Sequence, residues 1–400
     1  MRKTDLPAIA GGQPAFDRPV PMVLPEGQPN LDFVDDVLDI LRSGQFTNGA
    51  RVREFEAAAA AYLKVPHCIA VSSCTSGLLL LLKALDIRGE VITPSFTFHA
   101  TAHSIVWNGL QPVFADCDLE TFCLDPESVR SRSSNETAAI LAVHLFGSPA
   151  PVAELEQLAA DLKVPLIFDA AHAFGSRIHE VPVGSFGTAE VFSFTPTKLV
   201  VAGEGGLIAT RNSDLARRLR IARNYGDGGN YDPEVLGLNA RMSEFHAALA
   251  FRGLGDLEER IERRDRIRRH YESRLASVPG IRFQRVRPDG RTACKDFSIL
   301  VDESAFGESR DWLFHALAKE NIGVRKYFYP PVHQQKLYRA VWDGKPLPNT
   351  EWISARIINL PIYSALSCEE ADRIADAIVR AHAFVKERAV RPRTRSAFGG

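Results

Sequence analysis

The sequence lacks an excess of charge of either sign and has no long apolar run. It carries 48 basic and 49 acidic side chains, so its formal net charge is -1 at pH 7. This balance argues against nucleic acid or an anionic membrane as the main partner. The longest apolar stretches, such as Leu78–Leu82, are far too short to span a bilayer. The N-terminal residues show no apolar segment after their charges, so we expect no secretory signal.

Paired cysteine motifs are also missing. None of the six cysteines forms a C-x-x-C pair, and most are flanked by apolar or strand-like sequence. This usage is typical of reduced, buried thiols in a cytoplasmic protein. We therefore expect a cytoplasmic location and no metal site.

The length of the chain indicates two domains, because 400 residues exceed the size at which a single core stops growing. We predict an N-terminal arm over residues 1–30 and a large α/β domain over 31–254. A smaller α+β domain should follow over 255–387, with strands near 283–287 and 295–301 and a last helix over 368–385. A basic tail over 388–400 is expected to be disordered.

Strands and helices alternate through the first half of the chain. This order predicts a mostly parallel sheet with helices on both faces. In such sheets, ligands bind beyond the carboxyl ends of the strands. The expected strands are residues 68–73, 90–94, 112–115, 138–145, 165–168 and 189–194.

One lysine stands out at the end of the last of these strands. Lys198 follows a Pro-containing turn and precedes the glycine-rich stretch Gly203–Gly206. A lysine in dry surroundings has a lowered pKa and can form a Schiff base with an aldehyde. A lone lysine in a turn is more often a solvated surface charge, so Lys198 needs support from other residues. That support comes from further side chains near strand ends, namely Ser73–Ser76, Phe98, Asp169, His172 and Ser193.

The stretch Ser72–Gly77 leads from a strand directly into a leucine-rich helix. Free backbone N–H groups and the positive end of a helix dipole bind phosphate. Serine and threonine are also favoured as plain helix caps, so both interpretations stay open.

Pyridoxal phosphate requires a lysine, a carboxylate for its ring nitrogen, an aromatic face and a phosphate cup. Asp169 stands at a strand end, where a lone buried carboxylate is costly unless it is paired with a cation. A protonated pyridine would be such a cation. The alternatives for Asp169 are a helix cap or a salt bridge.

Seven motifs together carry a resemblance to a known family. They are Gly44–Gly49, Ser72–Leu78, Pro94–Phe98, Phe168–Ala173, Ser193–Lys198, Gly237–Glu244 and Tyr329–His333. With them the chain resembles the DegT/DnrJ/EryC1/StrS family of sugar aminotransferases from Gly11 to about Ala383. This resemblance implies the pyridoxal phosphate-dependent transferase fold type I, which has a mostly parallel central sheet and a smaller α+β C-terminal domain.

The resemblance implies roles for four residues around the cofactor ring. Lys198 would hold the cofactor as a Schiff base and then move the proton between substrate and cofactor. Asp169 would pair with the ring nitrogen, His172 would hydrogen-bond the ring hydroxyl, and Phe98 would stack on the ring. For His172, a core histidine is the alternative.

The resemblance also implies the phosphate ligands, which would be Thr75, Ser76 and Ser193. Asn239 would reach the phosphate held by the other subunit, which makes a homodimer with shared active sites necessary. Two features depart from the family pattern: residues 199–202 are more apolar than usual, and Cys74 stands where the family usually carries glycine. Backbone N–H groups can still serve there.

Four further residues are candidates for substrate binding. The resemblance places Tyr329 and His333 on the substrate side. Arg223 and Arg241 could contact charged substrate groups, because arginine matches carboxylate and phosphate geometry. A surface salt bridge is an equally good interpretation of each arginine.

Lys198 favours transamination, since related sugar dehydratases carry histidine at this position. The resemblance implies L-glutamate as the amino donor and a nucleotide-linked keto sugar as the acceptor. Three segments resemble the branch that aminates C4 of dTDP-4-keto-6-deoxy-D-glucose: Gly89–Pro94, Ser104–Asn108 and Asp169–Gly175. The alternatives are C3 amination of a dTDP-3-keto sugar, amination of a keto-inositol, a pyridoxal phosphate-dependent sugar dehydratase, or a catalytically silent protein with the same fold.

Overall fold

The computed structural model describes residues 6–25 and 31–390. Its largest sheet has seven strands in the order β1-β9-β8-β5-β4-β2-β3. Strand β9 runs antiparallel to β1 and β8, and all other pairs are parallel. The prediction of a mostly parallel sheet is thus confirmed. The strands are β1 (His67–Val71), β2 (Glu90–Pro94), β3 (Gln111–Ala115), β4 (Thr137–Val143), β5 (Leu166–Asp169), β8 (Ala189–Ser193) and β9 (Gly206–Thr210).

Helices cover both faces of this sheet, because successive residues of its strands point to opposite sides. In β1, Ile69 and Val71 pack with helices α3 and α7, whereas Cys68 and Ala70 pack with α2 and α8. The helices of this part are α1 (Leu31–Ser43), α2 (Ala50–Leu63), α3 (Cys74–Ala84), α4 (His99–Trp107), α5 (Pro126–Arg132), α6 (Val152–Leu162), α7 (Ser213–Ala222) and α8 (Glu244–Leu254).

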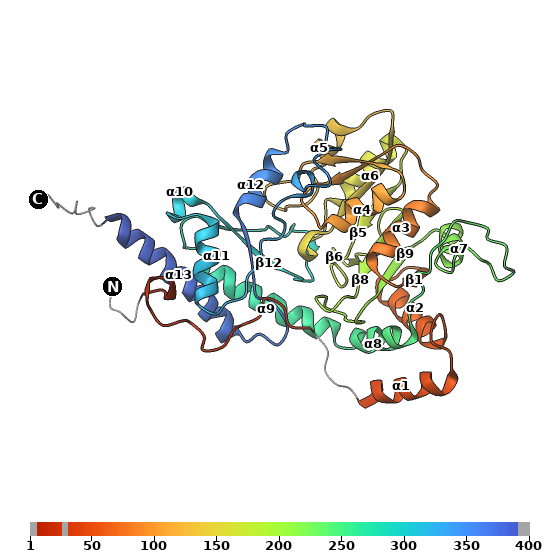
Figure 1. Cartoon of the computed structure of the whole chain (residues 1–400), viewed down its shortest axis with the longest axis horizontal. Helices are drawn as coiled ribbons and strands as arrows, with labels where there is room; N and C mark the ends of the chain where they lie inside the picture. Colours follow the sequence, from red (N-terminus) through yellow and green to blue (C-terminus); the bar gives the residue numbers. More distant parts are fainter. Residues whose placement is uncertain (1–5, 26–30, 391–400) are drawn as a thin grey trace, which may run out of the picture.

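The C-terminal part forms a separate core around a three-stranded antiparallel sheet, ordered β10-β12-β13. Helices α9, α11 and α13 lie together beside β12 (Figure 1). Helix α9 joins the two parts, since Ile261 packs in the core under α2 while Tyr271 packs in the C-terminal core. The elements are α9 (Leu257–Leu275), β10 (Ile281–Phe283), β12 (Phe297–Val301), α10 (Glu303–Phe306), α11 (Arg310–Lys319), α12 (Pro348–Arg356), β13 (Ile357–Leu360) and α13 (Cys368–Val390).

A third, small sheet ties the two parts together. Strand β11 (Gly290–Arg291) from the C-terminal part pairs with β6 (Arg177–Ile178), which also pairs with β7 (Val181–Pro182). This pairing brings the segment before β12 close to the large sheet. Lys295 and Asp296, which we expected inside a strand, lie in that segment.

The first described segment, residues 6–25, and the last helix both lie on the C-terminal part. The backbone N–H groups of Ala8 and Ala15 donate to Glu320, and Phe16 and Val20 are buried in the C-terminal core. Helix α13 continues to Val390, past the expected end of the last helix. Residues 1–5 and 26–30 of the predicted arm and residues 391–400 of the predicted tail lie outside the described residues.

The predicted domain boundary at residue 254 coincides with the end of α8, and we propose that the two domains divide there. Within residues 6–25 and 31–390, no helix has the length and apolar character needed to cross a membrane.

Candidate active site

A cavity of about 370 Å³ lies where the carboxyl ends of the large sheet meet the C-terminal part. Its volume is in the range of small-molecule sites. The structure brings six of the predicted site residues together in its lining: Thr75, Phe98, Asp169, His172, Ser193 and Lys198. They come from different elements, and the parallel topology makes these elements end at the same edge.

Lys198 lies in a turn after β8, where its backbone N–H donates to the Thr195 carbonyl at 3.0 Å. The pKa of Lys198 is lowered to about 8, mainly by burial and next by the nearby Lys295 cation. Asp296, Cys74 and Asp169 act in the opposite direction and raise the same pKa. The amine of Lys198 is therefore partly neutral near physiological pH, as a nucleophile must be.

Asp169 ends β5 and is almost completely buried. Its Oδ2 accepts a hydrogen bond from Thr101 Oγ1 at 2.8 Å, and its Oδ1 accepts one from the Ala171 N–H at 3.1 Å. Among the described residues, no cationic side chain lies within ion-pairing distance of this carboxylate. Burial raises the pKa of Asp169, while the Thr101 and Ala171 hydrogen bonds lower it. The site thus offers a buried carboxylate that would be stabilised by a cationic group in the cavity.

The position of one backbone group determines the tautomer of His172. The Phe146 N–H donates to His172 Nδ1 at 3.2 Å, so Nδ1 carries the lone pair and Nε2 carries the hydrogen. Burial is the main cause that lowers the pKa of His172 well below its usual value, and Lys198 and Lys295 contribute. His172 is therefore a neutral hydrogen-bond donor at Nε2.

The start of helix α3 forms one end of the cavity, which Ser73, Cys74 and Thr75 line. Ser73 is the N-cap, and it forms a reciprocal capping box with Ser76. The Ser76 hydroxyl also lies 3.0 Å from Ser72 Oγ, so its side chain serves the cap and does not line the cavity. The helix-cap interpretation therefore applies to Ser73 and Ser76, whereas the phosphate-site interpretation applies to the part of the turn at Cys74 and Thr75.

Close packing explains one glycine beside this turn. A Cβ atom on Gly206 would lie 2.5 Å from the backbone of Ser73 and Cys74. Glycine at the start of β9 therefore lets the sheet approach the first turn of α3, where backbone N–H groups are free to bind an anion.

Phe98 precedes α4, lines the cavity and keeps an exposed fraction of 50%, with its ring centroid 3.9 Å from that of His99. Its centroid lies 6.3 Å from that of Phe328, which comes from the C-terminal part. A half-exposed aromatic ring on a cavity wall is suited to stacking against a flat ligand.

The two candidate arginines take up structural positions. Arg223 is buried, forms an ion pair with Glu56, and donates to the Ala70 carbonyl at 2.8 Å. Arg241 donates to Asn224 Oδ1 at 2.7 Å. Neither lines the cavity, and Arg223 fits the salt-bridge alternative.

Three further candidates also lie outside the lining of the cavity. His333 is fully buried, with Nδ1 2.6 Å from Ser95 Oγ and Nε2 3.4 Å from Glu351 Oε1. Tyr329 is exposed beneath the Arg310 guanidinium, and Asn239 is exposed on the loop before α8.

Sequence reasoning missed the wall that comes from the C-terminal part. This wall contains Lys295, Asp296, Tyr327 and Phe328. Sequence reasoning also missed Thr101 as a hydrogen-bond partner of Asp169. No local pattern marks these residues, because their positions depend on how segments far apart in the sequence pack together.

Comparison with known proteins supports the interpretation of this site. The profile of the DegT/DnrJ/EryC1/StrS aminotransferase family matches residues 30–379. The chain belongs to this family. It is a pyridoxal phosphate-dependent sugar aminotransferase with the transferase fold type I.

Three solved structures show how far the likeness extends. DesI, solved in the presence of its TDP-sugar product, is 37% identical with a TM-score of 0.90, covering 96% of this chain and 98% of DesI. DesV from S. venezuelae, solved with a ketimine intermediate, is 31% identical with a TM-score of 0.83, covering 89% and 95%. A family member from Brucella abortus is 30% identical with a TM-score of 0.81, covering 88% and 95%.

The cavity fits this cofactor on observations of its own. The buried carboxylate of Asp169 lacks a cation, and the ring nitrogen of the cofactor is one when protonated. The uncharged Nε2–H of His172, the half-exposed ring of Phe98 and the turn at Ser73–Thr75 match the hydroxyl, the ring and the phosphate.

Proposed function

We propose that this enzyme transfers an amino group from L-glutamate to a nucleotide-linked keto sugar, and that the acceptor carbon is C4 of dTDP-4-keto-6-deoxy-D-glucose. One observation supports the amino transfer. The same cavity contains a desolvated Lys198 and a buried Asp169, and among the described residues Asp169 has no cationic partner. The sugar is supported by the likeness to DesI, which was solved with a TDP-sugar product. The buried free thiols support the cytoplasm as the location.

In this proposal the chain positions the cofactor and moves protons. The cofactor supplies an electron sink when it is bound. Asp169 would keep the ring nitrogen protonated, His172 Nε2 would donate to the ring oxygen, and Phe98 would stack on the ring. Thr75, Ser193 and the backbone N–H groups of the first turn of α3 would bind the phosphate.

In the first half-reaction the neutral Nζ of Lys198 would take the proton from Cα of the donor and pass it to the cofactor. In the second half-reaction the same amine would take a proton from the cofactor and pass it to the acceptor carbon of the sugar. Asp169, Ser193, Lys295 and Asp296 line the cavity with Lys198 and are buried, which limits the access of water from their side.

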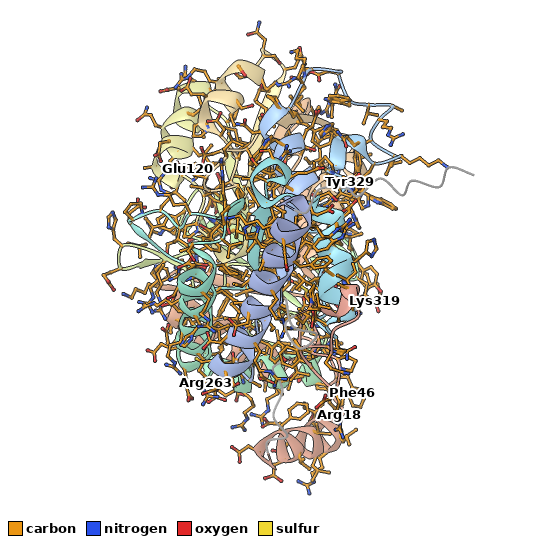
Figure 2. The ribbon with its side chains drawn as sticks, turned by 90° about the vertical axis from the view of Figure 1, so that its left-hand side faces the viewer. Arg18, Phe46, Glu120, Arg263, Lys319 and Tyr329 are labelled. Carbon is orange, nitrogen blue, oxygen red and sulfur yellow. The ribbon has the colours of Figure 1, made fainter. Side chains whose placement is uncertain are left out.

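We further propose that the active enzyme is a homodimer in which Asn239 of each subunit reaches the cofactor phosphate of the other. Asn239 is exposed and does not line the cavity of its own chain. Large apolar side chains are exposed near it, Tyr231, Leu236 and Leu238 among them. A second exposed apolar set lies on α1 at the end of the molecule, where Figure 2 shows Phe46 beside that helix. Such surfaces are typical of protein interfaces.

A coupled assay with glutamate tests the substrate. The enzyme is incubated with dTDP- and UDP-linked 3-keto and 4-keto sugars and a keto-inositol, and products are identified by mass and by NMR regiochemistry. Amination at C4 of the dTDP-4-keto sugar is expected. Amination at C3, or of the inositol alone, would replace the proposed substrate with one of the alternatives, and loss of a sugar hydroxyl without amination would show a dehydratase.

A mixing experiment tests the shared site. Lys198→Ala and Asn239→Asp are each expected to lose activity. When the two variants are unfolded, mixed and refolded, mixed dimers should regain activity because one of their sites combines wild-type Lys198 with wild-type Asn239. If Asn239 served its own subunit, no mixed dimer would contain an intact site and activity would stay low.

A further inference from the structure

The cavity contains a second buried lysine, which the proposed reaction does not use. Lys295 lines the same cavity as Lys198 and comes from the C-terminal part. Its Nζ lies 2.8 Å from Oδ1 of Asp296, and both side chains are almost completely buried. Among the described residues, Lys198 has no carboxylate within ion-pairing distance. Only one of the two lysines therefore has a counter-ion at short range.

Hydrogen bonds from two other parts of the chain hold the backbone of this pair. The Phe146 carbonyl accepts hydrogen bonds from the N–H groups of Lys295 at 3.1 Å and Asp296 at 3.4 Å. The same Phe146 peptide donates to His172 through its N–H. On the other side, Arg264 of α9 donates to the Lys295 carbonyl at 3.3 Å.

Ser176 adds a further connection. Its Oγ donates to the Gly147 carbonyl at 2.7 Å and accepts from the Ala293 N–H at 3.0 Å. The segment before β12 is thus held against the loop after β4, and the charges of Lys295 and Asp296 are held at a fixed position beside the site.

We propose that Lys295 and Asp296 are positioning residues that act on the charge state of Lys198 in opposite directions. The ammonium of Lys295 disfavours a second cation beside it, and the carboxylate of Asp296 offsets part of that effect. Neither residue needs to touch the substrate. The Asp296 carboxylate holds the Lys295 ammonium in place through their ion pair.

Besides this pair, the titratable groups that line the cavity with Lys198 are Cys74 at the start of α3, Asp169 at the end of β5, His172 after β5, Glu204 before β9 and Tyr327 of the C-terminal part. Cys74 and Asp169 favour the charged form of Lys198, and the neutral His172 carries no charge to oppose it. Among these charged neighbours, Lys295 has the largest effect, and it lowers the pKa of Lys198. Charges interact strongly here because the surroundings are poor in water.

The consequence for the reaction rests on the proposed function. Lys198 must be neutral to take a proton from the substrate carbon, and a fixed neighbouring cation increases the neutral fraction at a given pH. The effect of Lys295 on Lys198 can be measured without this assumption.

Competitive labelling of the cofactor-free protein with acetic anhydride tests the pair, because only neutral amines react. Mass spectrometry of the peptide that contains Lys198 gives its labelling rate against pH, with the exposed Lys163 as internal standard. Lys295→Met should raise the labelling midpoint of Lys198 by about one pH unit, a tenfold change in proton affinity. Asp296→Asn should move the midpoint in the opposite direction. Lys295→Arg, which keeps the cation, should leave it near the wild-type value.

The matched control is Arg380→Met, which removes a cation from the buried Glu320 at a site away from the cavity. It should not move the midpoint. If Lys295→Met does not fold with Asp296 left unpaired, the double variant Lys295→Met/Asp296→Asn gives the same test, with a smaller upward shift expected. A midpoint that stays unchanged in the Lys295 variants, or that moves in the same direction for both residues, would overturn the proposal. Because labelling needs no sugar and no cofactor, these outcomes are independent of whether the proposed substrate is right.

Discussion

The two walls of the cavity are built in different ways. The wall from the large sheet has its polar groups at strand ends, with Ser73 after β1, Asp169 at the end of β5 and Ser193 at the end of β8. The wall from the C-terminal part has an ion pair, Lys295–Asp296, on the segment before β12. The first wall also holds Lys198, and among the described residues neither Lys198 nor Asp169 has an ion-pair partner, whereas the charges of the second wall are already paired.

This difference separates groups that take part in chemistry from groups that set its electrostatics. A buried ionisable group without a partner is costly for folding, so it is retained where a ligand supplies the partner. A buried pair is satisfied within the chain and acts on its neighbours only through its field. Variants on the sheet wall should therefore have the larger effects on activity.

The largest effect is expected for Lys198→Ala. The variant has no amine to bind the cofactor or to carry the proton, so both the visible absorbance of the bound cofactor and the aminotransferase activity should disappear. Absorbance spectra of purified protein with added cofactor measure the first, and the coupled glutamate assay measures the second. A wild-type protein that stays colourless with added cofactor would contradict the proposed role of Lys198.

The same substitution should have the opposite effect on folding. The pKa of Lys198 is lowered in the folded protein, so the protonated amine destabilises the fold at and below about pH 8. The cofactor-free Lys198→Ala protein should then have a higher thermal midpoint than wild type at pH 7, and the difference should shrink as the pH rises toward the pKa of an unfolded lysine.

Asp169→Asn should have the next largest effect. Breaking a buried ion pair costs about 3–5 kcal/mol, and the same loss in the transition state would correspond to roughly a 10²–10⁴-fold loss of rate. The cofactor should still bind through Lys198, so its absorbance should remain. Asp116→Asn is a matched control, because Asp116 is also buried but accepts the N–H groups of Asn349 and Thr350 away from the cavity. Equal losses in both variants would argue for a general folding defect.

The pH dependence of folding gives a second measurement on Asp169. Burial raises its pKa, so the folded protein binds this proton more tightly than the unfolded chain does. The free energy of unfolding of the cofactor-free protein should therefore fall as the pH rises through the raised pKa of Asp169, and denaturant melts across that range should show no such decline in Asp169→Asn.

The sequence predicts the sheet wall well because its logic is local. A strand pattern followed by a polar residue is enough to place Asp169 or Ser193 at the binding edge of a parallel sheet. Lys295 could not be found in this way, because its position depends on the pairing of β11 with β6 and on Arg264 of a distant helix. Arg223 shows the opposite difficulty, since a buried arginine beside a strand has the same local pattern whether it binds a ligand or Glu56.

Thr101→Val sharpens the comparison within the sheet wall. The Thr101 hydroxyl donates to Asp169 and lowers the pKa of this carboxyl, so its removal should raise that pKa. The carboxylate is then less populated at a given pH, and the acid limb of the activity profile should move to higher pH. A hydrogen bond to a charged group contributes about 1.5–3 kcal/mol, so we expect the aminotransferase activity of Thr101→Val to fall by roughly ten-fold or more.

Ser104→Ala is the matched control for this variant. Ser104 is buried on the same helix and donates to the Thr101 carbonyl at 2.7 Å, but it does not contact Asp169. Its profile should keep the wild-type shape. A displaced acid limb in Ser104→Ala would mean that the helix as a whole, and not the Thr101 hydroxyl, sets the charge of Asp169.

The smallest effect on chemistry is expected for Glu190→Gln, although Glu190 is buried on β8, next to the strand that carries Asp169. The carboxylate of Glu190 accepts from His144 Nε2 at 3.0 Å and from the N–H groups of Gly184 at 2.7 Å and Phe186 at 2.8 Å. A glutamine must turn its own NH2 group toward at least one of these donors. The free energy of unfolding should therefore fall by about 1–3 kcal/mol, as for a buried donor that loses its acceptor. Cofactor absorbance and its pH dependence should stay at wild-type values, because this carboxylate is already compensated within the chain. A change in the cofactor spectrum comparable to that of Asp169→Asn would show that burial alone, and not the missing partner, distinguishes the residues of the site.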